Sequence, residues 1–139
     1  MPAAPGFEIA GFSHVGIRVA DAEQACAFYE KLGFVLHYTD KKDPVLVLRN
    51  AAGVELNLIV NAVRRGEATN VLMDVPEKHA GITHFALRVP SIERTVAALG
   101  EAGIALTEGP VPLGDGISCF VRDPDRNVIE LREEQGAAP

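Results

Sequence analysis

The spacing of apolar and polar residues changes in the same way twice along the chain, from strand-like alternation to helical spacing and back to strand-like alternation. Residues 12–19 and several short runs between 34 and 60 are rich in β-branched and aromatic residues in partial alternation, which is typical of strands. Residues 21–33 instead show apolar residues at helical spacing, with Asp21 as N-cap and Gly33 as the stop. The first half therefore predicts a βαβββ unit, with strands at 12–19, 34–40, 45–50 and 53–60.

The second half repeats this order. A strand is expected at 82–89 and a helix at 91–103, with Ser91 as its N-cap. The remaining strands are expected at 104–109, 117–123 and 127–133, with GPVPLGDG as a connection before the second of them. Residues 61–80 lack a clear period and are a predicted linker, in which TNVLMDVP fits either a short strand or a lid. The pattern predicts a single α+β domain over 1–139, with modules at 10–60 and 81–133.

The two halves also match residue by residue. Residues 14–36 align without a gap with 84–106, so that His14 falls on His84. Each half then closes with a glutamate in a strand-like run, Glu55 in GVELNLIV and Glu130 in NVIELRE. Because alternate side chains of a strand share a face, all four lie opposite the apolar residues that the helices should cover. A duplicated histidine and carboxylate predicts a metal site built from both halves.

Composition limits the other possibilities. The chain has 139 residues, and 13 basic against 19 acidic residues give a net charge of −6, which disfavours nucleic acid or an anionic membrane as partner. The two cysteines, Cys26 and Cys119, are expected to be small buried hydrophobes in a reducing compartment. No leader-like start or membrane-length apolar run is found, so a cytoplasmic location is expected. His37 and His79 have no counterpart in the other half and are expected at the surface.

With these residues in place, the chain resembles the vicinal oxygen chelate superfamily, and within it the glyoxalase I-like branch. The resemblance covers about residues 10–133. Its most specific motifs are the paired strand openings SHVGIRV and THFALRV, the helix end FYEKLGF, and the closing FVRDPDRNVIEL. The last of these is similar to the aspartate-proline-aspartate turn that precedes the final metal glutamate in that superfamily.

The resemblance implies two βαβββ modules that form an open, curved, eight-stranded cup around one divalent ion, usually in a homodimer. Extradiol dioxygenases and thiol-transferring fosfomycin resistance enzymes typically use two histidines and one glutamate, and bleomycin-binding relatives lack the metal set. Here the four positions hold His14, Glu55, His84 and Glu130, which is the pattern of glyoxalase I enzymes. The implied function is a metal-dependent lyase or isomerase of lactoylglutathione lyase type, which acts through an enediolate on a hemithioacetal or a related α-hydroxycarbonyl.

The ligand set suits this chemistry. Two imidazoles and two carboxylates are hard nitrogen and oxygen ligands that favour one Ni²⁺, Co²⁺, Mn²⁺, Fe²⁺ or Zn²⁺ per site. Such an ion stabilises the negative charge that develops as a carbon-bound proton leaves. By position, Glu130 is the candidate base and Glu55 a ligand and second acid or base, while the two histidines only hold the ion.

Candidate substrate-binding residues share the ligand face: Arg18, Arg88 and Asn57. Arg18 matches the arginine that meets a glutathione carboxylate in resembling enzymes. Ile59 and Ala80, however, stand where such enzymes have asparagine and arginine. We therefore expect a small-molecule substrate with a thiol cosubstrate whose identity the sequence leaves open.

Other functions remain open at this point. The same cup could sequester an antibiotic without turnover, although Glu55 and Glu130 favour an enzyme because buried carboxylates are costly unless they are paired with a cation. An epimerase or an extradiol dioxygenase is also compatible with the superfamily. The four ligands, finally, could come from one chain or be shared across a dimer.

Overall fold

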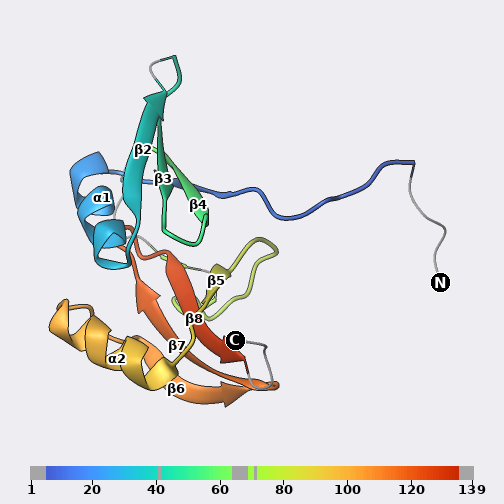
Figure 1. Cartoon of the computed structure of the whole chain (residues 1–139), viewed down its shortest axis with the longest axis vertical. Coiled ribbons are helices and arrows are strands. Elements are labelled where there is room, and N and C mark those ends of the chain that lie inside the picture. Colours follow the sequence, from blue (N-terminus) through green and yellow to red (C-terminus); the bar gives the residue numbers. More distant parts are fainter. Residues whose placement is uncertain (1–5, 41, 64–68, 71, 135–139) are drawn as a thin grey trace.

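The computed structural model describes residues 6–40, 42–63, 69–70 and 72–134. It contains two βαβββ modules in tandem, which confirms the expected fold class (Figure 1). The first module consists of β1 (Val15–Arg18), α1 (Ala22–Lys31), β2 (Val35–Asp40), β3 (Val45–Arg49) and β4 (Glu55–Ile59). The second consists of β5 (His84–Arg88), α2 (Ile92–Glu101), β6 (Glu108–Leu113), β7 (Gly116–Arg122) and β8 (Val128–Glu134).

Each module forms its own four-stranded sheet. The strand orders are β1-β4-β3-β2 and β5-β8-β7-β6, so the two sheets have the same topology and remain separate. The first and last strands of each module pair in parallel, β1 with β4 and β5 with β8, and the other neighbours are antiparallel. Figure 1 shows the first module above the second, with α1 and α2 along the same side of the molecule.

The helices begin and end where the sequence predicts. Asp21 accepts a hydrogen bond from the Gln24 backbone N–H at 3.0 Å, and Ser91 accepts one from Arg94 at 3.2 Å. Gly33 follows α1 with a φ of +92°, a left-handed conformation that glycine adopts without steric cost. Local capping chemistry therefore sets the length of α1 and the start of α2.

The helix-covered faces of the sheets form the core, as the alternation predicts. In the first module, Ala25 and Tyr29 of α1 pack with Phe34, Leu56 and Leu58, all fully or almost fully buried. In the second module the buried set is Ile92, Leu99, Ile104, Cys119, Val121, Ile129 and Leu131. Burial of these apolar side chains fixes which face of each strand is left for polar residues. Both cysteines are free, Cys119 buried and Cys26 partly so.

One predicted strand is wrong. The second strand of the second module runs over Glu108–Leu113 and not over 104–109, so that most of the expected connection is strand. Two prolines obscure it in the sequence, but β6 lies at the edge of its sheet, where a missing backbone N–H costs no ladder hydrogen bond. Ile104 instead packs into the core directly after α2.

The aspartate-proline-aspartate turn between β7 and β8 connects the two modules. The buried Tyr29 hydroxyl of α1 donates to Asp123 Oδ2 at 2.8 Å, and the Ala20 backbone N–H donates to Asp125 Oδ1 at 3.2 Å. Burial raises the pKa of Asp123, while hydrogen bonds from Asn127 and Tyr29 oppose that shift. A satisfied polar contact, more than a continuous sheet, thus fixes α1 against the second module.

The linker also contacts the second module. Among the residues described between 61 and 80, none is in a helix or strand. Arg122 donates to both carboxylate oxygens of Asp74 at 2.8 Å each, and these bonds hold the pKa of Asp74 well below its usual range. Residues 69–76, for which a strand or a lid was expected, therefore form a turn where the structure describes them, and Asp74 of this turn binds Arg122 of β7. Neither helix in the described part of the chain has the length and hydropathy to span a bilayer.

We predict that Tyr29→Phe lowers the free energy of unfolding by about 1–3 kcal/mol, because the buried Asp123 carboxyl loses a hydrogen-bond donor. Chemical denaturation measured by circular dichroism checks this. Tyr38→Phe is the matched control, since Tyr38 is 52% exposed and its substitution should change stability by less than about 0.5 kcal/mol. Equal effects of the two substitutions would contradict the role given to this contact.

Candidate metal centre

The second module brings His84 and Glu130 together. His84 opens β5, Glu130 lies in the parallel neighbour β8, and His84 Nε2 is 3.0 Å from Glu130 Oε1. The pair is well sheltered, with 29% and 10% of the two side chains exposed. The ring of Phe120 meets the His84 imidazole edge to face at 6.1 Å and covers one side of it. This pair therefore lies in a mostly dry environment.

Glu130 is held by a second set of contacts. Ser118 Oγ donates to Glu130 Oε2 at 2.6 Å, and Arg132 Nη1 lies 3.8 Å from the same oxygen. Arg132 also donates to Ser118 Oγ at 3.3 Å. These donors compensate a carboxylate that would be costly to bury alone. Sequence reasoning missed Ser118, whose only signal is a small polar residue in an otherwise apolar strand.

The first module brings His14 and Glu55 together more loosely, and through the other ring nitrogen. His14 lies directly before β1 and Glu55 opens β4, with His14 Nδ1 3.7 Å from Glu55 Oε2. This pair is more open, with 42% and 17% of the side chains exposed. The other oxygen of Glu55 accepts a hydrogen bond from Arg49 Nε at 2.8 Å. Arg49 was not predicted as part of the site.

A hydroxyl group orients each histidine. Ser13 Oγ is 2.8 Å from His14 Nδ1, and Thr83 Oγ1 is 2.8 Å from His84 Nδ1. A hydroxyl both donates and accepts, so it suits either ring tautomer, including the one with an unprotonated Nε2 that a metal ion needs. The sequence carries a signal for this contact, since a hydroxyl residue directly precedes the histidine in both halves.

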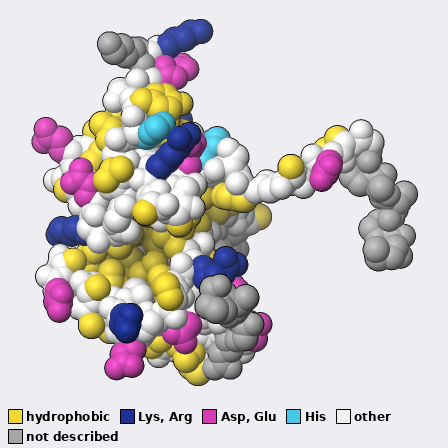
Figure 2. Space-filling view, viewed as in Figure 1, with side chains coloured by type: hydrophobic (Ala, Val, Ile, Leu, Met, Phe, Trp, Pro, Cys, Tyr) yellow, Lys and Arg dark blue, Asp and Glu magenta, His cyan; other side chains and the backbone are white. Residues whose placement is uncertain are grey.

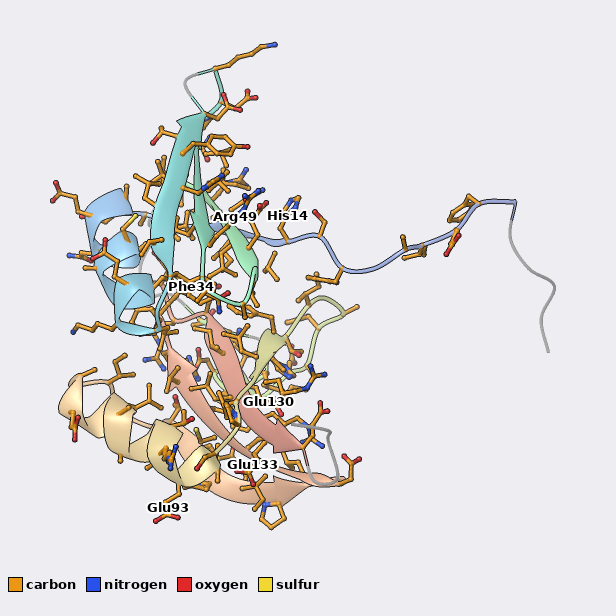
Figure 3. The ribbon with its side chains drawn as sticks, viewed as in Figure 1. His14, Phe34, Arg49, Glu93, Glu130 and Glu133 are labelled. Atoms are coloured by element: carbon orange, nitrogen blue, oxygen red, sulfur yellow. The ribbon has the colours of Figure 1, made fainter. Side chains whose placement is uncertain are left out.

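The four predicted ligands do not meet within one chain. Over the ranges that the structure describes, no three histidine, cysteine or acidic side chains converge enough to hold one ion. Figure 3 shows His14 on the first module and Glu130 on the second, well separated. The structure thus brings together His14 with Glu55 and His84 with Glu130, but not one pair with the other. A single chain carries two half-sites, each with one nitrogen and one oxygen donor.

The predicted substrate-binding residues have mixed surroundings. Arg18 ends β1 and donates to Asn61 Oδ1 at 3.1 Å, while Arg88 ends β5 and donates to Glu134 Oε2 at 3.2 Å. Both arginines are therefore occupied by local partners. Asn57 follows Glu55 by two residues in β4, and its buried Oδ1 has no hydrogen-bond partner among the described residues. Asn57 thus offers a polar atom to a small molecule.

The donor chemistry fits a divalent ion, provided that two half-sites combine. In each glutamate a donor fixes one oxygen, Arg49 on Glu55 and Ser118 on Glu130, and the other oxygen faces the histidine. Each half-site thus presents an imidazole and a single carboxylate oxygen, ligands that suit first-row divalent metals. Two half-sites together supply four such donors.

Comparisons with known proteins agree with this fold. The chain aligns with a glyoxalase/dioxygenase from Nostoc punctiforme with a TM-score of 0.72 and 24% identity, over 96% of this chain and 97% of that one. A glyoxalase family protein from Bacillus cereus aligns with a TM-score of 0.68 and 18% identity, over 96% and 100%. TnmS3, an antibiotic binding protein from Streptomyces sp. CB03234, aligns with a TM-score of 0.68 and 25% identity, over 93% and 99%.

Sequence comparison identifies the family. A search of curated proteins gave no significant match. The family profile described as Glyoxalase/Bleomycin resistance protein/Dioxygenase superfamily, in contrast, matches residues 11–131, which include nearly all of both modules and all four predicted ligands. This match agrees with the resemblance read from the motifs. The chain belongs to the glyoxalase/bleomycin resistance protein/dioxygenase superfamily.

Proposed function

We propose that this protein is a metal-dependent enzyme of glyoxalase I type, a lyase or isomerase that acts through an enediolate on a hemithioacetal or a related α-hydroxycarbonyl. The observation that carries the proposal is the duplicated half-site. His14 lies with Glu55 and His84 with Glu130, each carboxylate keeping one oxygen toward its histidine. One Ni²⁺, Co²⁺, Mn²⁺, Fe²⁺ or Zn²⁺ per complete site fits these ligands.

The complete site is proposed to form between two copies of the chain. In a twofold dimer the interface is self-complementary, so the first half-site of one copy meets the second half-site of the other, and the reverse. Two equivalent four-ligand sites result from one contact. The separation of the two half-sites within a chain supports this arrangement.

The residues around the two half-sites have separate proposed roles in proton transfer and substrate binding. Glu130 would take the carbon-bound proton through Oε1, the oxygen that otherwise would ligate the ion, while the Ser118 hydroxyl fixes Oε2 and so sets the direction of Oε1. Glu55, fixed by Arg49, serves as ligand and as second acid or base. Asn57 Oδ1 accepts a hydrogen bond from a substrate hydroxyl. Arg18 and Arg88 are proposed to bind charged groups of the substrate or of a thiol cosubstrate. When bound, the ion supplies Lewis-acid stabilisation of negative charge on substrate oxygens.

A second function is favoured by one observation. Both carboxylates already lie beside a cation of the same chain, since Arg49 contacts Glu55 at 2.8 Å and Arg132 lies 3.8 Å from Glu130. A small-molecule binding protein without turnover is therefore compatible with these glutamates, as the similarity to an antibiotic binding protein also suggests. Metal content separates the two functions, because only the enzyme requires an ion.

We predict that the dimer binds about one divalent ion per chain, and that His14→Ala and His84→Ala each abolish this binding. When the two variants are unfolded and refolded together, about a quarter of the wild-type sites should return, because half of the dimers are mixed and each has one intact site. Metal analysis after gel filtration measures this. Sites contained within one chain would give no recovery in the mixture.

We also predict that Glu130→Gln lowers turnover by about 10²–10⁴-fold, because the amide cannot accept the proton. The assay uses methylglyoxal with several thiols and added Ni²⁺, Co²⁺, Mn²⁺ or Zn²⁺. Glu93→Gln is the control, since Glu93 lies on α2 away from both half-sites (Figure 3). Wild-type protein that binds the ions but turns over none of these mixtures would favour the binding function instead.

A further inference from the structure

A row of polar side chains crosses the whole first sheet. In strand order it runs His14, Glu55, Arg49 and His37, one residue at or beside each of β1, β4, β3 and β2. Arg49 joins its neighbours, with Nε 2.8 Å from Glu55 Oε1 and Nη1 3.0 Å from His37 Nε2. Figure 2 shows histidine, basic and acidic side chains gathered on this part of the surface. The predicted metal half-site therefore continues into a polar patch made of one guanidinium and one imidazole, Arg49 and His37.

A strand irregularity places His37 in this row. The β2–β3 register shifts between Leu36 and Tyr38, so His37 is the extra residue of a β-bulge. Bulges redirect a side chain and are frequent beside functional sites. His37 is exposed, as expected from the sequence, but its imidazole is directed to Arg49 and is not simply solvated.

Arg49 keeps donors free after these contacts. A guanidinium has five N–H donors and no acceptor, so His37 Nε2 must accept in its contact with Arg49. One N–H bonds Glu55 and one bonds His37, which leaves about three for another partner. Since 45% of the Arg49 side chain is exposed, these donors are accessible. Their planar, forked geometry matches a carboxylate.

The second module lacks an arginine at the cross-strand position beside its glutamate. Phe120 is the cross-strand partner of Glu130 in β7–β8, as Arg49 is the cross-strand partner of Glu55 in β3–β4. Phe120 is buried, and its partner in β6 is the acidic Glu108. The two half-sites therefore carry matching residue pairs but different cross-strand neighbours, Arg49 beside Glu55 and Phe120 beside Glu130. The cation near Glu130, Arg132, is engaged by Ser118 and Asp115. A site assembled from both half-sites would therefore have Arg49 on one side and the ring of Phe120 on the other.

We propose that Arg49, oriented by Glu55 and His37, binds a carboxylate group of the substrate, so that the protein acts on anionic small molecules whose apolar part faces Phe120 of the other half-site. The carboxylate contact itself needs only one chain. The orientation toward Phe120 rests on the proposed function, since it requires the two-chain site.

Binding of a matched pair of probes tests the carboxylate contact. The probes are methylthioacetate and its neutral amide, 2-(methylthio)acetamide, and their affinities are measured by ligand-observed NMR at low salt. Metal-free full-length protein is used first, because a bound ion would itself attract the anion. Wild-type protein should bind the anion about tenfold more tightly than the amide, as expected for a charge-assisted, forked hydrogen bond.

Three variants locate the preference. Arg49→Met should abolish it, Arg49→Lys should keep only part of it, and His37→Ala should weaken it while leaving the Arg49–Glu55 pair in place. Arg94→Met, on the exposed face of α2, should leave it unchanged. An anion preference that survives Arg49→Met, or a wild-type protein that binds both probes equally or neither, overturns the proposal.

The same measurements on protein reconstituted with Ni²⁺ or Zn²⁺ separate this inference from the proposed function. Failure of the proposed function appears as absent metal binding or absent turnover, whereas the anion preference of the metal-free protein is unaffected by either. With active protein, the inference further requires that Arg49→Met raise KM for the methylglyoxal adduct of mercaptoacetate more than for that of 2-mercaptoethanol. Equal changes in the two KM values overturn it.

Discussion

The parallel pairing of the first and last strand in each module is the constraint on which the site depends. It brings a histidine from the start of one strand beside a glutamate more than 40 residues later, in both β1–β4 and β5–β8. The helix between them buries the opposite face, so the register cannot slip by one residue without turning apolar side chains to solvent. The core thus holds the polar pair in place.

The two repeated pairs consist of the same residue types but have different surroundings. Phe120, Ser118 and Arg132 shelter and fix Glu130, whereas Arg49 binds Glu55, which is 17% exposed beside the more open His14. A sheltered carboxylate with one fixed oxygen suits proton transfer, because a dry site strengthens the interactions made there. The more open carboxylate, beside a cation with free donors, suits ligand binding. The differences between the surroundings of the two pairs therefore matter for function as much as the shared histidine and glutamate do.

Much of the fold could be predicted because it depends on local signals. Period-2 and helical patterns located the strands and helices, and Asp21, Gly33 and Ser91 marked helix ends through their own side chains or backbone freedom. The position of β6 was not predicted because prolines are tolerated in a strand only at a sheet edge, and the sequence does not show which strand lies there. Arg49 and Ser118 were not predicted as site residues for a similar reason, since only the cross-strand register makes them neighbours of the glutamates.

The sequence by itself determined the duplicated modules, the face on which each polar residue lies, and the residues that form the two histidine–glutamate pairs. These follow from repeats and periodicity, which are properties of neighbouring residues along the chain. Only the tertiary structure decided that the two pairs lie apart in one chain, because their separation depends on how the modules pack through Tyr29 and the Asp123 turn. It also decided that Arg49 is the cross-strand neighbour of one glutamate and Phe120 of the other, since cross-strand neighbours are set by how the strands pair.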